Sequence, residues 1–383
     1  MFDSLKRYRL RNYRFLLILY VSVLTVIGIL VIGSAQKSVQ SKQIYGFVGG
    51  FIIMVFLSLI DYTFILKFKW MMYALMIFLL GLVRIIGSTT GGATRWISIA
   101  GIKFQPSEIA KIFIILFFAD FLSKYRERLN TMKIMALAIL LVAFPLLLIV
   151  IQPDLSTTIM TAIIFVTLLF IAGLSYKIIL TVLGITVPVI TVGFIYVVQN
   201  ADKIISSGSK IGYQVMRIMS WIDPTNEKYS SKAIQQQNSI MAIGSGQLWG
   251  KGLNNSAATS MKNSNYIMEP QTDFIFTVAG EELGFIGSMI IIGLLILICF
   301  ECIMIARKSK EFSGRLIACG MATLISFQSI INISVAVGIL PNTGIPLPFV
   351  SYGLTSLMSL YIGIGIVLNV GLQPKSNNRG GIL

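Results

Sequence analysis

Residues 15–35 read FLLILYVSVLTVIGILVIGSA, an apolar run without a charged side chain. A helix needs about 20 such residues to cross the hydrocarbon core of a bilayer, so the run predicts a transmembrane helix. A secretory signal peptide is the alternative, because basic residues precede the run and residues 33–35 resemble a cleavage site. The apolar part of a signal peptide measures only about 7–15 residues, and further apolar runs follow here, which favours the transmembrane helix.

Apolar runs of similar length recur along the whole chain. Of its 383 residues, 56% are hydrophobic and 12% are charged, whereas about a quarter of an ordinary soluble domain is charged. Spans are expected near residues 15–35, 44–60, 70–87, 107–123, 134–151, 155–172, 178–199, 274–305, 316–340 and 350–372. We therefore predict an all-α polytopic membrane protein with about ten transmembrane helices, in which residues 1–383 form a single integral membrane domain.

Basic residues predict how the chain is oriented in the membrane. If both termini are cytoplasmic, the loops on that side hold most of the 31 Lys and Arg residues and the short outer loops hold few. The formal charge of +16 is spread over short loops and forms no continuous basic face. Membrane topology therefore explains the charge better than nucleic-acid binding does. We expect an integral membrane protein whose partners include membrane lipid and no nucleic acid.

Three outer segments are too long, or too rich in Gly and Pro, to be simple turns. They are residues 88–106, residues 200–273 between the seventh and eighth spans, and residues 341–349. Such segments are usually functional in a compact protein. The first is amphipathic enough to dip into the outer interface. The last carries prolines that exclude a helix, so a re-entrant element packed against protein is expected.

A metal site built from Cys and His is nearly excluded. The chain has no His, and its three cysteines, Cys299, Cys302 and Cys319, all lie in apolar segments. Cys299 and Cys302 form a CxxC pattern, but they lack the βαβ context that a redox motif requires. We expect the cysteines to pack against protein or to face lipid, and we predict no metal-ligating residues.

The sequence from Gln105 to Lys111 predicts a helix start at the outer surface. Pro106 suits the first helical position, Gln105 is a weak cap, and Glu108 is placed to reach back to it. An anion could bind there, with Lys111 one turn further on and Arg95 on the preceding loop. Two cations favour a diphosphate over a single carboxylate. Alternatively, Glu108 and Lys111 pair with each other and so lower the cost of burying both charges.

Carboxylates also mark the outer ends of later spans. Gln152 and Asp154 end the fifth span, where Asp154 either contributes to a site or caps the sixth helix. Asp273 lies between loop and helix with apolar neighbours, which would raise its pKa by desolvation. Such a group suits general base catalysis on a sugar hydroxyl, although Asp273 alone could be a helix cap. Glu281 and Glu282 follow, and they cannot both be caps.

Five sequence motifs follow one another along the chain in an order that is typical of one protein family. They read GGATRWISIAGIKFQPSEIAKI at 91–112, QPDLSTT at 152–158, SIMAIGSGQLWGKGL at 239–253, EPQTDFIFTVAGEELGFIG at 269–287 and GILPNTGIPLPFVSYG at 338–353. Together with the ten spans, they resemble the SEDS family (shape, elongation, division and sporulation), which includes RodA, FtsW and SpoVE. The resemblance covers essentially the whole chain, and TGIPLPF looks most like the RodA branch.

The resemblance implies a peptidoglycan glycosyltransferase that polymerises lipid II into glycan strands on the outer face of the membrane, for cell shape and elongation or for division. The Asp of the TDFIF motif maps to Asp273 as the catalytic carboxylate. The Arg of the RW motif maps to Arg95, and the Glu and Lys of PSExxK map to Glu108 and Lys111. Members of the family usually work with a class B penicillin-binding protein.

The sequence departs from the family pattern at several positions. Ser156 and Gln247 replace Gly, Trp249 replaces Phe, Leu354 replaces Gly, Met268 replaces Pro, and Gln271 stands where His is frequent. None of these changes removes a charged residue. We therefore expect them to change local backbone shape more than activity.

The expected reaction is inverting. Asp273 would take a proton from the acceptor hydroxyl, and undecaprenyl diphosphate would leave, with Arg95 and Lys111 supplying positive charge. The sequence leaves open a divalent cation such as Mg²⁺, held by the diphosphate more than by protein. The remaining candidates for substrate binding are Gln105, Glu108, Gln152, Asp154, Glu282 and Ser351. The alternatives are a lipid II flippase without chemistry and a scaffold that activates a penicillin-binding partner.

Overall fold

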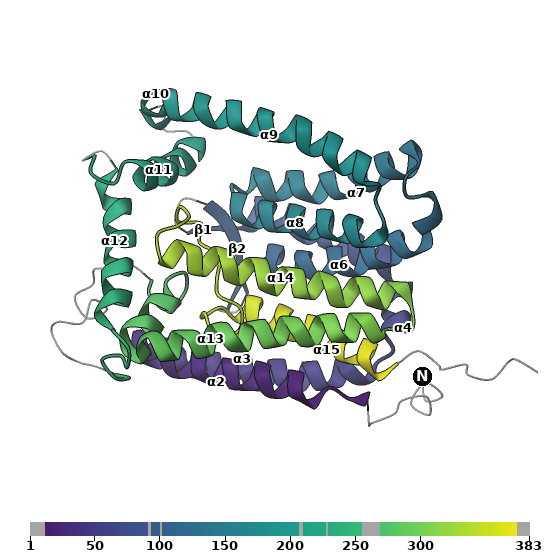
Figure 1. The fold of residues 1–383 in the computed structure, drawn as a ribbon, viewed down its shortest axis with the longest axis horizontal. Helices are drawn as coiled ribbons and strands as arrows, with labels where there is room; N and C mark the ends of the chain where they lie inside the picture. Colours follow the sequence, from purple (N-terminus) through teal and green to yellow (C-terminus); the bar gives the residue numbers. More distant parts are fainter. Residues whose placement is uncertain are drawn as a thin grey trace, which may run out of the picture.

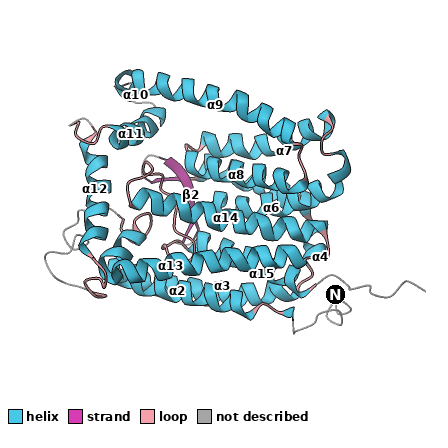
Figure 2. Cartoon of the chain, viewed as in Figure 1, coloured by secondary structure: helices cyan, strands magenta, loops and turns pink. Residues whose placement is uncertain are grey.

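The computed structural model describes residues 12–90, 93–99, 102–206, 210–226, 229–254 and 269–373. Long helices run side by side along the length of the molecule, and shorter helices, strands and irregular loops gather at one end (Figure 1). Helices make up nearly all of the described chain, with the strands confined to one small region (Figure 2). This arrangement confirms an all-α polytopic membrane protein.

The expected spans correspond to long helices in the described residues. These are α2 (Phe15–Ala35), α3 (Lys37–Leu59), α5 (Lys69–Ile86), α6 (Pro106–Lys124), α7 (Met132–Ile151), α8 (Leu155–Ala172), α9 (Tyr176–Gln199), α13 (Ile275–Lys308), α14 (Phe312–Ala336) and α15 (Leu354–Leu372). In the described part of the chain, nine of them are long and apolar enough to cross a membrane. The remaining one is α6, which carries Glu108, Lys111 and Asp120 along its length.

Shorter elements connect the long helices. They are α4 (Tyr62–Lys67), a 3₁₀ turn (Arg126–Arg128), α10 (Ala201–Ser206), α11 (Lys210–Ile222) and α12 (Ser230–Ser245), together with β1 (Ser88–Thr90), β2 (Ala93–Ile99) and β3 (Ile102–Phe104). Within the segment 88–106, the described strands form an antiparallel sheet in the order β1-β2-β3. Its expected contact with the outer interface stays a prediction. The segment 200–273, expected as a long outer loop, contains three helices.

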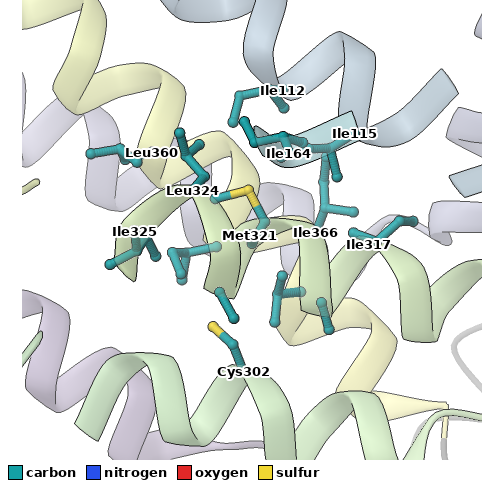
Figure 3. Close-up of a cluster of buried hydrophobic side chains, with 14 of the residues drawn as sticks. Ile112, Ile115, Ile164, Cys302, Ile317, Met321, Leu324, Ile325, Leu360 and Ile366 are labelled. Atoms are coloured by element: carbon teal, nitrogen blue, oxygen red, sulfur yellow. The ribbon is translucent and has the colours of Figure 1, made fainter. Parts of the chain in front are cut away.

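The core of the bundle forms where α6 and α14 are enclosed by their neighbours. Figure 3 shows Met321 and Leu324 of α14 among side chains from α6, α8, α13 and α15. Most residues of α6 are buried despite its charges. In contrast, no described side chain of α9 is buried, and this helix lies along the edge of the molecule (Figure 1). The charges of Glu108 and Lys111 on α6 therefore lie inside protein and do not face lipid.

The span expected at 274–305 is not one continuous helix. Its backbone breaks at Gly284, which has φ 67° and ψ −163°. Such a break frees backbone groups, and the segment 247–252 bonds to them: the N–H groups of 251 and 252 donate to the carbonyls of Glu281 and Glu282, at 3.0 Å each. On the other side, the N–H of Phe285 donates to the carbonyl of Gln247 at 2.8 Å. A short helix that begins just after Asp273 is thus held separately from the rest of α13.

The expected irregular element at 341–349 is confirmed. Residues between α14 and α15 form no regular structure, yet Leu347, Phe349 and Val350 are buried. Helix α2 packs directly on this loop, because a Cβ added to Gly28 would lie 2.8 Å from the Cα of Val350. Protein therefore surrounds backbone that lipid could not satisfy.

Candidate active site

Asp273 lies immediately before α13, and its backbone is bonded to the irregular loop. The side-chain amide of Asn332, on α14, donates to the carbonyl of Asp273 at 2.9 Å and to the carbonyl of Ile345 at 2.7 Å. Residue 332 itself is almost completely buried. One amide thus fixes the carboxylate segment and the loop relative to each other.

Ser351 makes a second connection between the same two segments. Its hydroxyl donates to the carbonyl of Thr272 and accepts from the N–H of Leu347, at 2.7 Å in both cases. The N–H of Tyr352 donates to the carbonyl of Gln271 at 2.8 Å. Ser351 is buried. The geometry gives this residue a positioning role, and its predicted contact with substrate stays a prediction.

The side chain of Asp273 faces a space beside Gly344. A Cβ added to Gly344 would lie 3.4 Å from Oδ2 of Asp273 and 3.8 Å from Nη1 of Arg217, so both side chains border the same space. Arg217 comes from α11 and donates to the carbonyl of Thr343 at 3.3 Å. Among the described residues, the carboxylate of Asp273 itself makes no hydrogen bond or ion pair.

The electrostatic surroundings of Asp273 suit a general base. Burial by neighbouring protein atoms raises its pKa from 3.8 to about 6. The positive charge of Arg217 lowers the pKa and the negative charge of Glu269 raises it. Arg95 lowers the pKa and Asp154 raises it by smaller amounts. Desolvation was the expected cause, and the direction agrees. At neutral pH the group is therefore mostly ionised and more basic than an ordinary aspartate.

Arg217 was not predicted from the sequence. It lies on one face of α11 with Gln214 and Trp221, and each of these side chains donates to a backbone carbonyl of an irregular segment: Gln214 to Pro153 at 3.2 Å and Trp221 to Gly338 at 3.0 Å. Their spacing places the three residues on one side of a helix. This spacing was the available signal, but it did not reveal which segments the helix would cover.

Arg95, Gln105 and Asp154 come together next to this space. Arg95, on β2, places Nη1 3.6 Å from Oδ1 of Asp154 and donates to the carbonyl of Pro153 at 2.8 Å. The amide of Gln105 donates to Asp154 at 3.3 Å. Asp154 also accepts from the N–H of Thr157 at 3.1 Å, so the expected helix cap is present as well. The predicted capping role of Gln105 is wrong, because its side chain makes no cap hydrogen bond to α6.

Glu108 and Lys111 form the ion pair that was considered as the alternative to anion binding. Their charged atoms lie 2.8 Å apart, and both side chains are buried. Lys111 also donates to Gln328 at 3.2 Å, and Gln328 donates to the carbonyl of Pro346 at 2.9 Å. Glu108 does not reach back to Gln105 as expected. The pair braces α6 against the irregular loop, and its predicted contact with a diphosphate stays a prediction.

Gln152 and Glu282 lie outside the group around Asp273. Gln152 is buried and donates to the carbonyl of Leu80 at 2.8 Å. Glu282 accepts a hydrogen bond from Ser34 and stands nine residues after Asp273, or about 13 Å along a helix. Its neighbour Glu281 forms an ion pair with Lys251 at 2.8 Å.

Polar atoms near the Asp273 space could receive a ligand. The buried side-chain atoms without a hydrogen-bond partner in the described part of the chain include three next to this space: Nε of Arg95, Oδ1 of Asn342 and Oγ1 of Thr343. Buried polar atoms are normally satisfied, so these are available to a polar substrate. No group of three His, Cys, Asp or Glu side chains that could hold a metal occurs among the described residues. A cation held by a diphosphate would not need such a group.

A bundle of long apolar helices with a polar, partly buried group of residues at one end defines a multi-pass membrane protein. Residues 9–376 match the family of cell cycle proteins that comprises FtsW, RodA and SpoVE. The chain belongs to this family.

Known relatives agree with the family. The chain is 32% identical to the probable peptidoglycan glycosyltransferase FtsW of Haemophilus ducreyi, over 96% of this chain and 91% of the relative. It is also 32% identical to the peptidoglycan glycosyltransferase MrdB of Escherichia coli, over 94% of this chain and 93% of the relative. A structure solved for the coordination of polymerization and crosslinking by a peptidoglycan synthase complex has the same fold, with a TM-score of 0.75 and 24% identity over 94% of this chain and 97% of that chain. Equal identity to FtsW and MrdB does not separate the branches, so the likeness to RodA in particular stays a prediction.

Proposed function

We propose that this chain is a peptidoglycan glycosyltransferase that polymerises lipid II into glycan strands, in cell elongation or division, with Asp273 as its general base. Membership of the family supports the activity. The observation that carries the role of Asp273 is its raised pKa next to Arg217, in a carboxylate that makes no ion pair among the described residues. Three other acidic groups at this end are paired: Glu108 with Lys111, Asp154 with Arg95, and Glu281 with Lys251.

The reaction begins when Asp273 takes the proton of the 4-hydroxyl on the acceptor's N-acetylglucosamine. The oxygen attacks C1 of the donor's muramyl sugar from the face opposite the diphosphate, which inverts the configuration. The bond from C1 to the phosphate oxygen breaks, and undecaprenyl diphosphate leaves with both electrons. This leaving group is already acidic, so it needs positive charge and no proton donor.

Arg217 and Arg95 are the cations best placed to stabilise the leaving diphosphate. Both lower the pKa of Asp273 through their positive charge. Both guanidinium groups also donate hydrogen bonds to backbone carbonyls next to the site. Lys111, the cation expected from the sequence, is buried against Glu108 and acts through the loop instead. A divalent cation such as Mg²⁺ would be held with the diphosphate and would add to this charge.

The partner proposed for the chain is a class B penicillin-binding protein, whose transpeptidase would crosslink the growing glycan strand. The orientation proposed for the chain has both termini in the cytoplasm and Asp273 at the outer face of the bacterial cell membrane. This orientation follows from the distribution of Lys and Arg over the loops. Lipid II and the glycan strand then meet the site outside the cell.

Purified protein with labelled lipid II tests the proposal, with and without the partner, when polymer and transbilayer movement are both measured. Asp273→Asn, which keeps the shape of the side chain, should lower polymer formation by about 10²–10⁴-fold because the base is lost. Asp223→Asn is the matched control, because it makes the same change in a carboxylate whose hydrogen bonds go to Thr225 and Asn226. Full polymerisation by Asp273→Asn would contradict the assignment, and lipid II movement without polymer would favour the flippase.

A further inference from the structure

A cavity of about 450 Å³ lies at the opposite end of the bundle from Asp273. Its lining includes Arg14, Phe15 and Leu16 at the start of α2. Ile305 and Lys308 line it at the end of α13. Because α13 begins beside Asp273 and ends at Lys308, the cavity faces the other side of the membrane from the proposed active site. The proposed reaction does not use it.

Two cations, Arg14 and Lys308, line this cavity. Arg14 is half-buried and lies 3.3 Å from a carboxylate oxygen of Glu301 through one of its guanidinium nitrogens. A guanidinium has five N–H donors, so one ion pair does not exhaust it. Lys308 is exposed and offsets the negative end of the α13 dipole. The start of α2 adds a partial positive charge.

The cavity also has an apolar wall. Phe15 is 65% exposed and Leu16 is 49% exposed, while Ile305 is buried behind them. Both exposed side chains begin the span of α2 and therefore lie where the headgroup region meets the hydrocarbon. A ligand that fits this wall and the two cations has an anionic head and an apolar tail.

We propose that this cavity binds the headgroup phosphate of an anionic phospholipid from the leaflet opposite Asp273. The phosphate lies between Arg14 and Lys308, and the acyl chains lie along Phe15 and Leu16. Basic pockets between transmembrane helices bind acidic lipids in this way. A soluble anion would gain nothing from the apolar wall, so the charge and the wall together select a lipid. The site is independent of the proposed glycosyltransferase activity.

Native mass spectrometry of the purified full chain tests the proposal, with phosphatidylglycerol or phosphatidylcholine supplied as the lipid. The double variant Arg14→Gln/Lys308→Gln should retain phosphatidylglycerol about thirty-fold more weakly, since two cations near an anionic lipid are lost. The control Arg307→Gln/Lys310→Gln makes the same change of charge at exposed residues of the same end that do not line the cavity. It should retain phosphatidylglycerol almost normally.

Three results would overturn the proposal: equal losses in both double variants, equal retention of the two lipids by the parent chain, or displacement of phosphatidylglycerol by millimolar inorganic phosphate. Arg14→Gln also breaks the contact with Glu301 and could destabilise the fold. The single variant Lys308→Gln avoids that contact, because Lys308 is exposed. It should still weaken retention of phosphatidylglycerol relative to Lys310→Gln, and no difference between them would count against the site.

Discussion

Asp273 combines two properties that the neighbouring carboxylates do not share. It is half-buried and carries a raised pKa, and its side chain has no ion pair among the described residues. A carboxylate that already forms an ion pair must break that pair before it accepts a proton, which costs free energy. Asp273 has no such pair among the described residues. Proximity to Arg217 keeps the pKa from rising further. The balance leaves a base that is both ionised and accessible near neutral pH.

Polymer formation should therefore depend on pH with a limb near pH 6. The base acts in its deprotonated form, so activity should rise as pH increases through about 6 and should level off above it. Initial rates of polymerisation between pH 5 and 8, at lipid II concentrations well below saturation, measure this limb, because they report the pKa of the free enzyme. A flat profile across that range would show that another group, or a step other than chemistry, controls the rate.

Arg217→Gln should weaken catalysis in two ways. Loss of the charge removes the effect that lowers the pKa of Asp273, so the limb of the pH profile should move upward from about 6. Loss of a cation next to the diphosphate should also lower the rate by about 10²-fold. Arg84→Gln is the matched control, because Arg84 is an exposed arginine in the last turn of α5. A lower rate with an unchanged pH profile would mean that Arg217 does not act on Asp273.

At the residue scale, the sequence predicts those functional groups whose neighbours in the sequence are unusual. Asp273 could be found because a carboxylate between a loop and an apolar helix is unusual. Arg217 could not be found, because it is one cation among several in the long segment 200–273. Its role depends on where α11 packs in the folded protein. The pairing of Glu108 with Lys111 was only one of two readings, since spacing along a helix allows both.

Among the elements, the broken helix α13 depends on a single residue. At Gly284 the backbone has φ 67° and ψ −163°, a region that residues with a side chain rarely adopt, and an added Cβ would overlap the backbone of Gly250. The turn at 247–252 and the break in α13 therefore fit each other only without that Cβ. The short helix after Asp273 takes its position from this fit.

Gly284→Ala should destabilise the end of the protein that holds Asp273 by about 1–3 kcal/mol and reduce polymer formation, because Asp273 would lose its support. Gly293→Ala, in the same helix, is the control. A Cβ there meets nothing within 4 Å, and alanine favours helix over glycine, so this variant should be at least as stable as the parent. Thermal unfolding in detergent and the polymer assay measure both effects. Equal stability of the two variants would mean that the break is not needed.

Elements were predictable where local composition decides them. The first span was expected at 15–35 and is found at Phe15–Ala35, because the thickness of the hydrocarbon sets the length of an apolar helix. The break at Gly284 and the sheet β1-β2-β3 were missed for a different reason. Both depend on partners elsewhere in the chain, and a glycine in an apolar run does not reveal that segment 247–252 will bond across it.

Across the whole molecule, the irregular segments converge at one end of the bundle. The loop between α14 and α15, the turn between α7 and α8, and the segment before α13 are joined by side chains that donate to backbone carbonyls, among them Asn332, Ser156 and Arg217. Irregular backbone in a membrane protein must be satisfied by protein or water. The polar residues that satisfy it also build the site, so the stability of this end and its chemistry share the same residues.

The orientation of the molecule is the remaining prediction, and the proposed reaction depends on it. Ser98→Cys, exposed on β2, should react with an impermeant maleimide in intact spheroplasts, whereas Lys310→Cys, exposed beyond the far end of α13, should react only after permeabilisation. The parent chain, with Cys299, Cys302 and Cys319 in its helices, is the control for background labelling. The opposite pattern would place Asp273 in the cytoplasm, where a polymerase of outer-leaflet lipid II could not reach its substrate.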